Sequence, residues 1–481
     1  MNSLIVLRTL GMLLLCEAVT MLPPVVVALI YREDTITAFL ASIAITALLG
    51  AGLFSIRVKN KIIRYKEGFA IVTFGWLMVS ILGALPFLFS GALTSVIDAF
   101  FETVSGFTTT GATIIEDIEV LPYSLLFWRS FTHWLGGMGI LVLALALAPA
   151  LGGGTFQILK AESPGPISTK LTPRVNNTAK ILYVTYTVIT LAEIVLLTVG
   201  GMPLFDSFIH TFGTLGTGGF SIKNASVGAY NSVYFDTVIT IFMIASGVNF
   251  SLYYIAFREK RLAGFLKDTE FKTYLSIIAV SIILVTLNLN GRLFGSVFES
   301  LRHASFQVAS IITTTGFTTT DFDIWPDFSR AILFVLMFVG ACAGSTGGSM
   351  KVIRIHLVFK YMKREVNRLI HPKAVRAVKI GNTSVQEEVL SSVMAFTMFY
   401  ILIFIMVTLF LTMQSYDLIS SAAAVAATLG NIGPGFGIVG PTSTYSALSG
   451  FSKLILCFCM ILGRLEIYTV ISLLFPQFWK R

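Results

Sequence analysis

A short stretch of small residues that ends in glycine occurs four times in this chain, as Thr108-Thr109-Thr110-Gly111, Gly216-Thr217-Gly218-Gly219, Thr313-Thr314-Thr315-Gly316 and Gly430-Asn431-Ile432-Gly433. We call these the first to fourth glycine loops. Each lies between apolar segments, and glycine permits dihedrals that turn carbonyl oxygens in unusual directions. A filter that replaces the water around a cation requires a ring of carbonyl oxygens. Four such loops predict four walls of one ion pore, whereas four unrelated turns are the alternative.

The composition indicates an integral membrane protein. Of the 481 residues, 55% are hydrophobic and 12% are charged, too few charges for the surface of a soluble protein. A helix crosses a bilayer with about 20 apolar residues. The segments that are spans or large parts of spans are expected at Leu4–Ile30, Thr37–Ile56, Phe69–Phe89, Leu125–Ala148, Ile181–Val199, Thr237–Ala256, Tyr274–Leu289, Ala331–Gly344, Leu390–Met413 and Leu454–Phe475. The first is too long for a cleaved signal peptide and should remain as a helix.

The basic residues gather in the connections between apolar segments. Clusters lie at Arg57–Lys66, Lys160–Lys180, Arg258–Lys272 and Lys351–Lys379, and two more basic residues end the chain. By the positive-inside rule these connections and both termini face the cytoplasm. The net charge of +9 would also suit a nucleic-acid-binding protein. The recurrence of the charges between spans argues against a nucleic-acid partner.

Acidic residues follow two of the glycine loops on the opposite side of the membrane. Such groups at an outer mouth would raise the local concentration of cations, although a solvated loop is an equal alternative. The residues are Glu116, Asp117 and Glu119 after the first loop, and Asp321, Asp323 and Asp327 after the third.

The sequence predicts an all-α polytopic membrane protein. Its four helix–pore loop–helix repeats would surround one pore with pseudo-fourfold symmetry. The predicted parts are an N-terminal two-helix domain at 1–66 and pore repeats at 67–174, 175–267, 268–384 and 385–481. An acid precedes each glycine loop, at Asp98, Asp206, Glu299 and Asp417. Because an acid suits the positive end of a short helix, the negative end should point toward a cation near the membrane centre.

The third repeat contains a second irregular stretch. One helix over residues 329–364 would be about 54 Å long at ~1.5 Å per residue, too long for a single straight span. Its middle consists of residues that disfavour a helix interior, namely Gly344, Ser345, Thr346, Gly347, Gly348 and Ser349. We predict a break with a flexible loop inside the membrane beneath the filter. Close helix packing on small residues is the alternative.

Arg464 lies within the last apolar segment. A cation in the membrane interior costs several kcal/mol unless it is hydrated or paired. We therefore expect Arg464 to face the pore or the 344–349 loop, whose carbonyl oxygens can accept its hydrogen bonds. There its charge would repel cations as part of a gate, whereas a structural anchor is the alternative. Glu17 and Glu193 also lie within spans and have no partner that the sequence identifies.

No catalytic constellation is evident, so we do not expect an enzyme. The cysteines fall in apolar segments and are interpreted as packing residues, and the histidines lack paired ligand spacing. The cysteines are Cys16, Cys342, Cys457 and Cys459.

The four glycine loops, the interruption at 344–349 and the Gly-Arg-Leu-Glu-Ile-Tyr stretch at 463–468 resemble the TrkH/TrkG family of the Trk–Ktr–HKT superfamily of potassium transporters. The resemblance covers the whole chain, including the two N-terminal helices that the shorter KtrB relatives lack. It implies potassium uptake across the bacterial inner membrane by a homodimer with one pore per protomer. It also implies control by a TrkA-like cytosolic regulatory subunit with nucleotide-binding domains, and no organic cofactor on this chain.

The resemblance also assigns residues. Family members with glycine at every loop apex are potassium-selective, and serine in one loop marks several sodium-selective plant relatives. All four apices are glycine here, which favours K⁺, with Rb⁺ also accepted. Ion coordination is carried over to Thr110 and Gly111, Gly218 and Gly219, Thr315 and Gly316, and Ile432 and Gly433; the gate is carried over to Gly344–Ser349 and Arg464. The loops lack the Thr-Val-Gly-Tyr-Gly run of potassium channels, which implies a milder preference for K⁺ over Na⁺. The fourth loop, followed by Pro434, is the least regular.

The leading hypothesis is a gated, channel-like pathway driven by the membrane potential, which supplies about 2.3 kcal/mol per charge per 100 mV. A proton- or sodium-coupled potassium symporter is the alternative. It would need an ionisable residue that faces each side in turn, for which Glu17 or Glu193 are candidates. A membrane enzyme or assembly scaffold would need a nucleophile–base pair or metal cluster that the sequence does not display.

Overall fold

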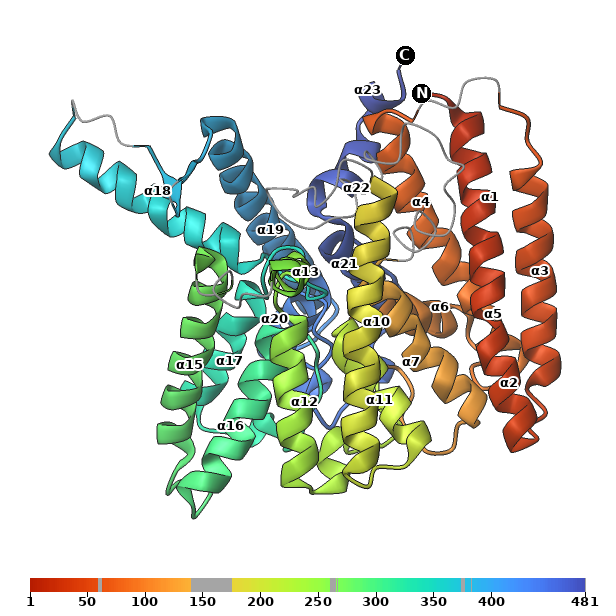
Figure 1. Cartoon of the computed structure of the whole chain (residues 1–481), viewed down its shortest axis with the longest axis horizontal. Coiled ribbons are helices and arrows are strands. Elements are labelled where there is room, and N and C mark those ends of the chain that lie inside the picture. The colour runs from red at the N-terminus through yellow and green to blue at the C-terminus, as the bar shows by residue number, and fades with distance from the viewer. Residues whose placement is uncertain are drawn as a thin grey trace.

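The computed structural model is helical and places both termini at the same end of the molecule (Figure 1). It describes residues 1–58, 63–139, 175–259, 265, 267–372, 377–381 and 383–480. The end of the predicted Leu125–Ala148 segment and most of the basic Lys160–Lys180 cluster lie outside these residues.

The N-terminal part packs against one side of the body, and two of its helices meet through small residues (Figure 1). It consists of α1 (Ser3–Thr20), α2 (Leu22–Tyr31) and α3 (Ile36–Phe54). A Cβ atom on Gly11 of α1 would lie 2.7 Å from the carbonyl oxygen of Gly50 in α3. Two glycines therefore allow the two helices to approach closely, as small residues do between membrane helices.

A long helix, a short helix and a second helix then follow one another four times. The long helices are α4 (Tyr65–Gly83, continued by α5, Leu85–Phe89), α10 (Val175–Val199), α15 (Thr269–Leu289) and α19 (Glu387–Met413). The short helices are α6 (Val96–Phe107), α11 (Leu204–Gly216), α16 (Val297–Ile312) and α20 (Leu418–Leu429). The second helices are α7 (Tyr123–Gly137), α12 (Val233–Ser246) with α13 (Phe250–Glu259), α17 (Asp327–Val339) with α18 (Val352–Ile370), and α21 (Gly450–Leu465) with α22 (Ile467–Leu474).

The remaining elements are short and lie in connections. They are η2 (Ser226–Tyr230), η3 (Phe322–Ile324), the antiparallel pair β1 (Lys379–Ile380) and β2 (Thr383–Ser384), η4 (Gly437–Val439), η5 (Tyr445–Ala447) and α23 (Pro476–Trp479).

The short helices and the second helices close into a ring. Each short helix packs between the second helix of its own repeat and that of the preceding one. The cyclic order of contacts is α6–α7–α11–α12–α16–α17–α20–α21 and back to α6. The four repeats therefore surround one central axis, in agreement with the predicted fold class.

Side-chain caps fix where three of the short helices begin. Ser95 accepts a hydrogen bond from the backbone N–H of Asp98 (3.3 Å), and Asp417 accepts one from Ser420 (3.0 Å). Ser296 caps α16 in the same way. The predicted acids Asp98, Asp206 and Glu299 lie in the first turn of their helices, and Asp417 is the N-cap of α20. With only 12 to 16 residues, these helices cannot cross a bilayer.

Six helices in the described residues are long and apolar enough to cross a membrane, with a bent seventh if α12 and α13 count together. The apolar segment predicted at Thr237–Ala256 does not form one straight helix, because α12 and α13 meet at 92°. The break is stabilised by tertiary contacts: the carbonyl oxygen of Gly247 accepts a hydrogen bond from the N–H of Cys342 (3.0 Å). The Leu454–Phe475 segment is likewise interrupted at Glu466, whose φ is +65°.

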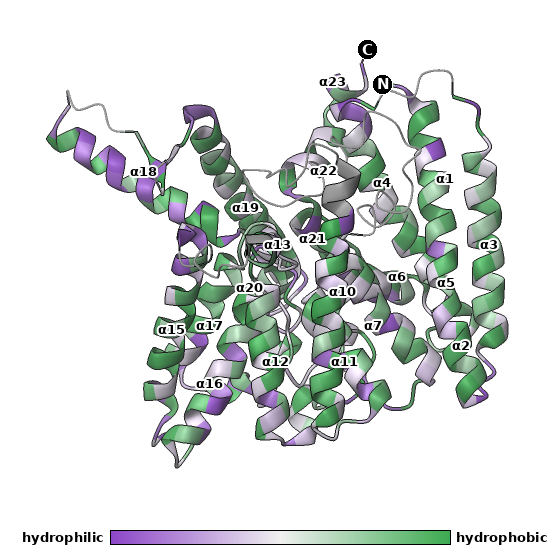
Figure 2. Cartoon of the chain, viewed as in Figure 1, coloured by the Kyte–Doolittle hydropathy of each residue, from purple (hydrophilic) through white to green (hydrophobic). Residues whose placement is uncertain are grey.

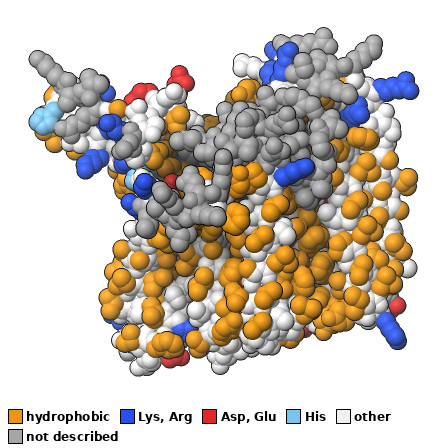
Figure 3. Space-filling view, viewed as in Figure 1, with side chains coloured by type: hydrophobic (Ala, Val, Ile, Leu, Met, Phe, Trp, Pro, Cys, Tyr) orange, Lys and Arg blue, Asp and Glu red, His pale blue; other side chains and the backbone are white. Residues whose placement is uncertain are grey.

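The exterior matches a lipid environment. The helices of the body are predominantly hydrophobic along their length (Figure 2). Hydrophobic side chains cover the visible sides of the body, while most visible Lys and Arg side chains gather at the end that carries the termini (Figure 3). At that end α18 projects away from the body and mixes apolar and basic residues (Figures 1 and 2).

Candidate functional site

The four glycine loops share one backbone conformation. Each follows the C-terminal end of a short helix, where the backbone carries partial negative charge. In each loop the glycine and the residue two positions before it have positive φ. The angles are +54° and +78° at Thr109 and Gly111, +56° and +77° at Thr217 and Gly219, +59° and +83° at Thr314 and Gly316, and +54° and +99° at Asn431 and Gly433.

The loops also meet one another in a closed ring. Each loop glycine lies against the carbonyl oxygen of the residue that precedes the glycine in a neighbouring loop. The neighbours are Gly218 for Gly111, Thr315 for Gly219, Ile432 for Gly316 and Thr110 for Gly433. A Cβ atom at any of these glycines would lie under 3.0 Å from that oxygen, which is closer than Cβ atoms approach other atoms in proteins. The structure thus brings all eight residues of the predicted coordination set together. At the four glycine positions it leaves no room for a side chain.

Hydrogen bonds between threonine hydroxyl groups stabilise the first and third loops. The Oγ1 atoms of Thr108 and Thr110 are 2.8 Å apart, as are those of Thr313 and Thr315. The fourth loop lacks threonine, and Asn431 takes this role: its Nδ2 donates to Thr110 Oγ1 and to the carbonyl oxygen of Met460, both at 2.9 Å. Sequence reasoning did not single out this amide, although its place in the loop was known.

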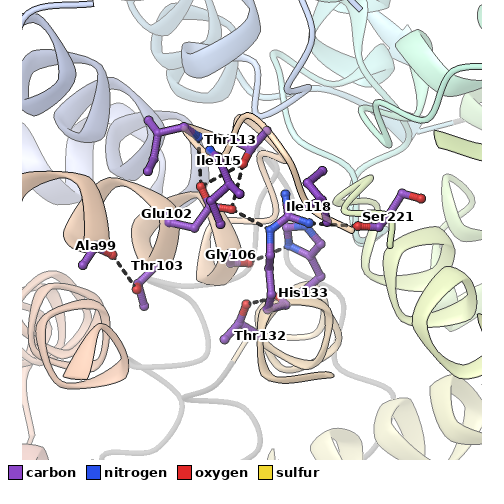
Figure 4. A network of polar contacts seen from close by, with 12 residues as sticks. Ala99, Glu102, Thr103, Gly106, Thr113, Ile115, Ile118, Thr132, His133 and Ser221 are labelled. Atoms are coloured by element: carbon purple, nitrogen blue, oxygen red, sulfur yellow. Dashed lines mark hydrogen bonds and ion pairs between the residues drawn. The ribbon is translucent and has the colours of Figure 1, made fainter. Parts of the chain in front are cut away.

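A buried ion pair links the first and second loops (Figure 4). Glu102 of α6 pairs with Arg129 of α7 at 2.6 Å, and both side chains are almost fully buried. Glu102 also accepts a hydrogen bond from the N–H of Ile114 (3.1 Å), and Arg129 donates to the carbonyl oxygen of Ser221 (3.0 Å). Through these bonds the pair holds the segments that follow the two loops. Removal of one partner would leave a buried charge unpaired and would be strongly destabilising.

A cavity of about 130 Å³ opens onto the ring. All four loop glycines line it, and the acidic residue at its wall is Glu116, which accepts a hydrogen bond from Ser446 (2.8 Å). The other acids expected at the outer mouth are mostly engaged: Glu119 pairs with Lys223 (2.9 Å), and Arg330 pairs with Asp323 and Asp327. The hydrogen bond from Lys223 lowers the pKa of Glu119, and the bound ammonium offsets its charge.

Replacement of Glu116 by glutamine is expected to raise the Rb⁺ concentration for half-maximal uptake about twofold at low ionic strength, because one negative charge leaves the cavity. The effect should shrink in 0.5 M choline chloride, where the screening length is only a few Å. Asp327→Asn is the matched control, since the Asp327 side chain is 99% exposed and does not line the cavity. Equal shifts in both variants would contradict the prediction.

The predicted break in the third repeat is present. Residues 340–351, which we call the inner loop, separate α17 from α18 and contain the predicted gate residues Gly344–Ser349. The inner loop lies against the ring: the N–H of Gly348 donates to Thr314 Oγ1 (2.7 Å), and a Cβ atom on Gly347 would lie 2.9 Å from the carbonyl oxygen of Thr313. The small residues therefore serve a close approach to the third glycine loop.

Arg464 joins the inner loop to the first repeat. Its Nη1 donates to the carbonyl oxygen of Thr346 (2.8 Å) and to Thr109 Oγ1 (3.2 Å). Its Nη2 donates to the carbonyl oxygens of Gly136 and Gly137. The guanidinium group thus lies beside the inner loop, and carbonyl oxygens accept its hydrogen bonds, as the sequence analysis expected.

Three charged residues that sequence reasoning did not assign hold the flanks of the inner loop. Glu270 of α15 accepts hydrogen bonds from the N–H groups of Ala343 (2.7 Å) and Ile353 (3.1 Å). Lys351 Nζ bonds the carbonyl oxygen of Gly347. Arg354 pairs with Glu466 at the break between α21 and α22. An acid at the start of a long helix and a basic cluster after the gate were the available signals.

No cluster of three or more His, Cys, Asp or Glu side chains that could hold a metal ion occurs among the described residues. The cysteines are unpaired, and three of the four are buried. The polar groups that meet in the ring are backbone carbonyl oxygens, which can coordinate a cation in place of water.

A ring of four carbonyl-bearing loops inside a membrane-crossing helical body defines a class of cation-transporting membrane proteins. The family model described as "TrkH: Cation transport protein" matches residues 35–480, and the chain belongs to this family. The chain is 40% identical to the Trk system potassium uptake protein TrkH of Halomonas elongata, with 100% of both chains covered. It is 40% identical to TrkH of Escherichia coli K12, with 98% of both covered. The crystal structure of the potassium transporter TrkH from Vibrio parahaemolyticus superposes with a TM-score of 0.90 at 38% identity over 100% of both chains.

Proposed function

We propose that this protein takes up potassium across the bacterial inner membrane through a gated, channel-like pore. The observation that carries the proposal is the closed ring, in which each loop glycine abuts a carbonyl oxygen of a neighbouring loop. Backbone oxygens held at fixed spacing replace the hydration shell of a cation. The relatives named as potassium uptake proteins support K⁺ as the transported ion, and Rb⁺ should substitute for it.

In this proposal the filter consists of the residues that form the ring. K⁺ would be coordinated by backbone oxygens of the loops, and the C-terminal ends of the four short helices would stabilise its charge. The coordinating pairs are Thr110 and Gly111, Gly218 and Gly219, Thr315 and Gly316, and Ile432 and Gly433.

The gate in this proposal is Gly344–Ser349 together with Arg464. The contact between Gly348 and Thr314 supports a position directly beneath the ring, where the loop would obstruct an ion leaving it. The bond from Arg464 to Thr346 supports a closed conformation that the guanidinium stabilises. Opening would require these hydrogen bonds to break, and a cytosolic subunit that binds nucleotides would supply the free energy.

The proposed assembly is a homodimer in the bilayer with a TrkA-like cytosolic partner. Both termini and the basic helix α18 lie at the same end of the molecule (Figure 1). By the positive-inside rule this supports a cytoplasmic location for that end. α18 follows the inner loop directly in sequence and carries basic residues, including Arg364 and Arg368. A partner docked there would be joined to the gate through one helix.

The test is ⁸⁶Rb⁺ uptake into proteoliposomes that contain only this protein. An outward K⁺ gradient drives uptake, and pH and Na⁺ are equal and clamped on both sides. Persistent uptake that K⁺ competes for better than Na⁺ supports the proposal. Uptake that appears only with an imposed proton or sodium gradient would overturn the channel-like mechanism in favour of coupled symport.

The candidates for coupled symport are Glu17 and Glu193, which lie within long apolar helices. Both are buried, and neither forms an ion pair with the described residues or lines the outer cavity. We expect Glu17→Gln and Glu193→Gln to leave the initial Rb⁺ flux within about twofold of the wild type, since glutamine is close in shape and no proton needs to move. A loss of flux that an imposed pH gradient modulates would indicate coupling instead.

A further inference from the structure

The ring has one irregular contact, which we call the seam, between Gly433 of the fourth loop and Thr110 of the first. A Cβ atom on Gly433 would lie 2.7 Å from the Thr110 oxygen, the longest of the four corresponding distances. The φ angle of Gly433 is +99°, whereas the other three loop glycines lie between +77° and +83°. The backbone is therefore less tightly packed at the seam than elsewhere in the ring.

Tyr445 bridges the seam on the outer side. Its hydroxyl donates to the carbonyl oxygen of Gly433 (2.7 Å), and its backbone N–H donates to the carbonyl oxygen of Thr113 (2.8 Å), which follows the first loop. The side chain is 2% exposed, and its ring packs against Phe101 of α6 with centroids 5.5 Å apart. One residue thus bonds the chain on both sides of the seam and is itself fixed by the short helix of the first repeat.

We propose that Tyr445 is a positioning residue that sets the width of the ring at the seam and thereby the preference for K⁺ over Na⁺. This inference rests on the proposed filter function. A carbonyl oxygen has two lone pairs, so Gly433 can accept the tyrosine hydrogen bond and still present oxygen to an ion. Without that bond the fourth loop can move inward at the seam, and a ring that contracts coordinates the smaller Na⁺ better.

The test is Tyr445→Phe, which keeps the aromatic contact with Phe101 and the backbone hydrogen bond to Thr113. The measured quantity is the ratio of the Na⁺ and K⁺ concentrations that halve ⁸⁶Rb⁺ uptake into proteoliposomes. We expect this ratio to fall about three- to tenfold, the range that the loss of one hydrogen bond gives. Tyr234→Phe is the matched control, because it also removes a hydroxyl that donates to a carbonyl oxygen (Leu196, 2.9 Å) at a site away from the ring. That control should keep the wild-type ratio.

An unchanged ratio in Tyr445→Phe, or an equal fall in both variants, overturns the inference. If Tyr445→Phe carries no flux, the same ratio is taken from the K⁺ and Na⁺ concentrations that half-maximally stabilise the purified protein against heat. Phe101→Leu is a second test. It removes the aromatic contact that holds the Tyr445 side chain, so it should also lower the ratio. A wild-type protein that does not prefer K⁺ over Na⁺ would refute the filter function itself, which separates the two failures.

Discussion

Replacement of Gly316 by serine is expected to abolish most of the preference for K⁺ over Na⁺ and to lower Rb⁺ uptake at least about tenfold. Gly316 has a φ of +83°, and a Cβ atom there would lie under 3.0 Å from the carbonyl oxygen of Ile432 and 2.9 Å from Pro434 Cδ. The strained dihedral alone costs about 1–3 kcal/mol. Because neither neighbour is the end of a flexible side chain, the third and fourth loops must separate.

The measurement is competition of K⁺ and Na⁺ with ⁸⁶Rb⁺ uptake into proteoliposomes, with melting temperature as a check on folding. Gly295→Ser is the matched control, since Gly295 lies just before α16 in the same repeat and has open space around its Cβ position. The control should behave as the wild type. Wild-type selectivity in Gly316→Ser would exclude the third loop from the filter.

Deletion of Gly344–Ser349 is expected to raise Rb⁺ flux on the order of tenfold in the absence of any cytosolic subunit. The deletion removes the hydrogen bonds from Gly348 to Thr314 and from Arg464 to Thr346. At about 1 kcal/mol each, two such bonds shift a closed-to-open equilibrium by an order of magnitude or more. The remaining chain can still connect α17 to α18, because the N–H of Val352 already donates to the carbonyl oxygen of Ala341 (3.0 Å).

Proteoliposome flux and size-exclusion elution of the deletion variant test this expectation. Arg464→Gln is the comparison, because it weakens the hold on the inner loop while it leaves the loop in place. We expect an intermediate increase in flux for that variant. Abolished flux in a monodisperse deletion variant with a wild-type melting temperature would mean that the inner loop supports the pore rather than closes it.

Local signals were enough to predict much of the fold. Asp98 and Asp206 mark helix starts, the four glycines mark the loops, and the glycines and serines of 344–349 mark a helix break. The bend after Ser246 and the break at Glu466 were not predicted, since contacts from distant segments stabilise them: the bond from Cys342 to Gly247 and the pair of Arg354 with Glu466.

The site was predictable in part, because local sequence patterns mark some of its residues. The residues of the ring belong to repeated motifs, so the sequence displays them. Tyr445, Glu270 and the pair of Glu102 with Arg129 act on loops that are far from them along the chain or in another repeat, and no local pattern marks them. The assignment of roles to the filter and gate residues stays a prediction until the uptake experiments are made.

The ring of four loops is formed by a single chain, and this has an evolutionary consequence. In a channel built from four identical subunits, one codon change alters all four walls at once. Here each wall is encoded separately, so a substitution changes one quarter of the ring and leaves the other three intact. The fourth loop already differs in this way, with Asn431 and Ile432 where the first and third loops have threonines. Selectivity in such a protein can therefore evolve in small steps, each tested by selection before the next.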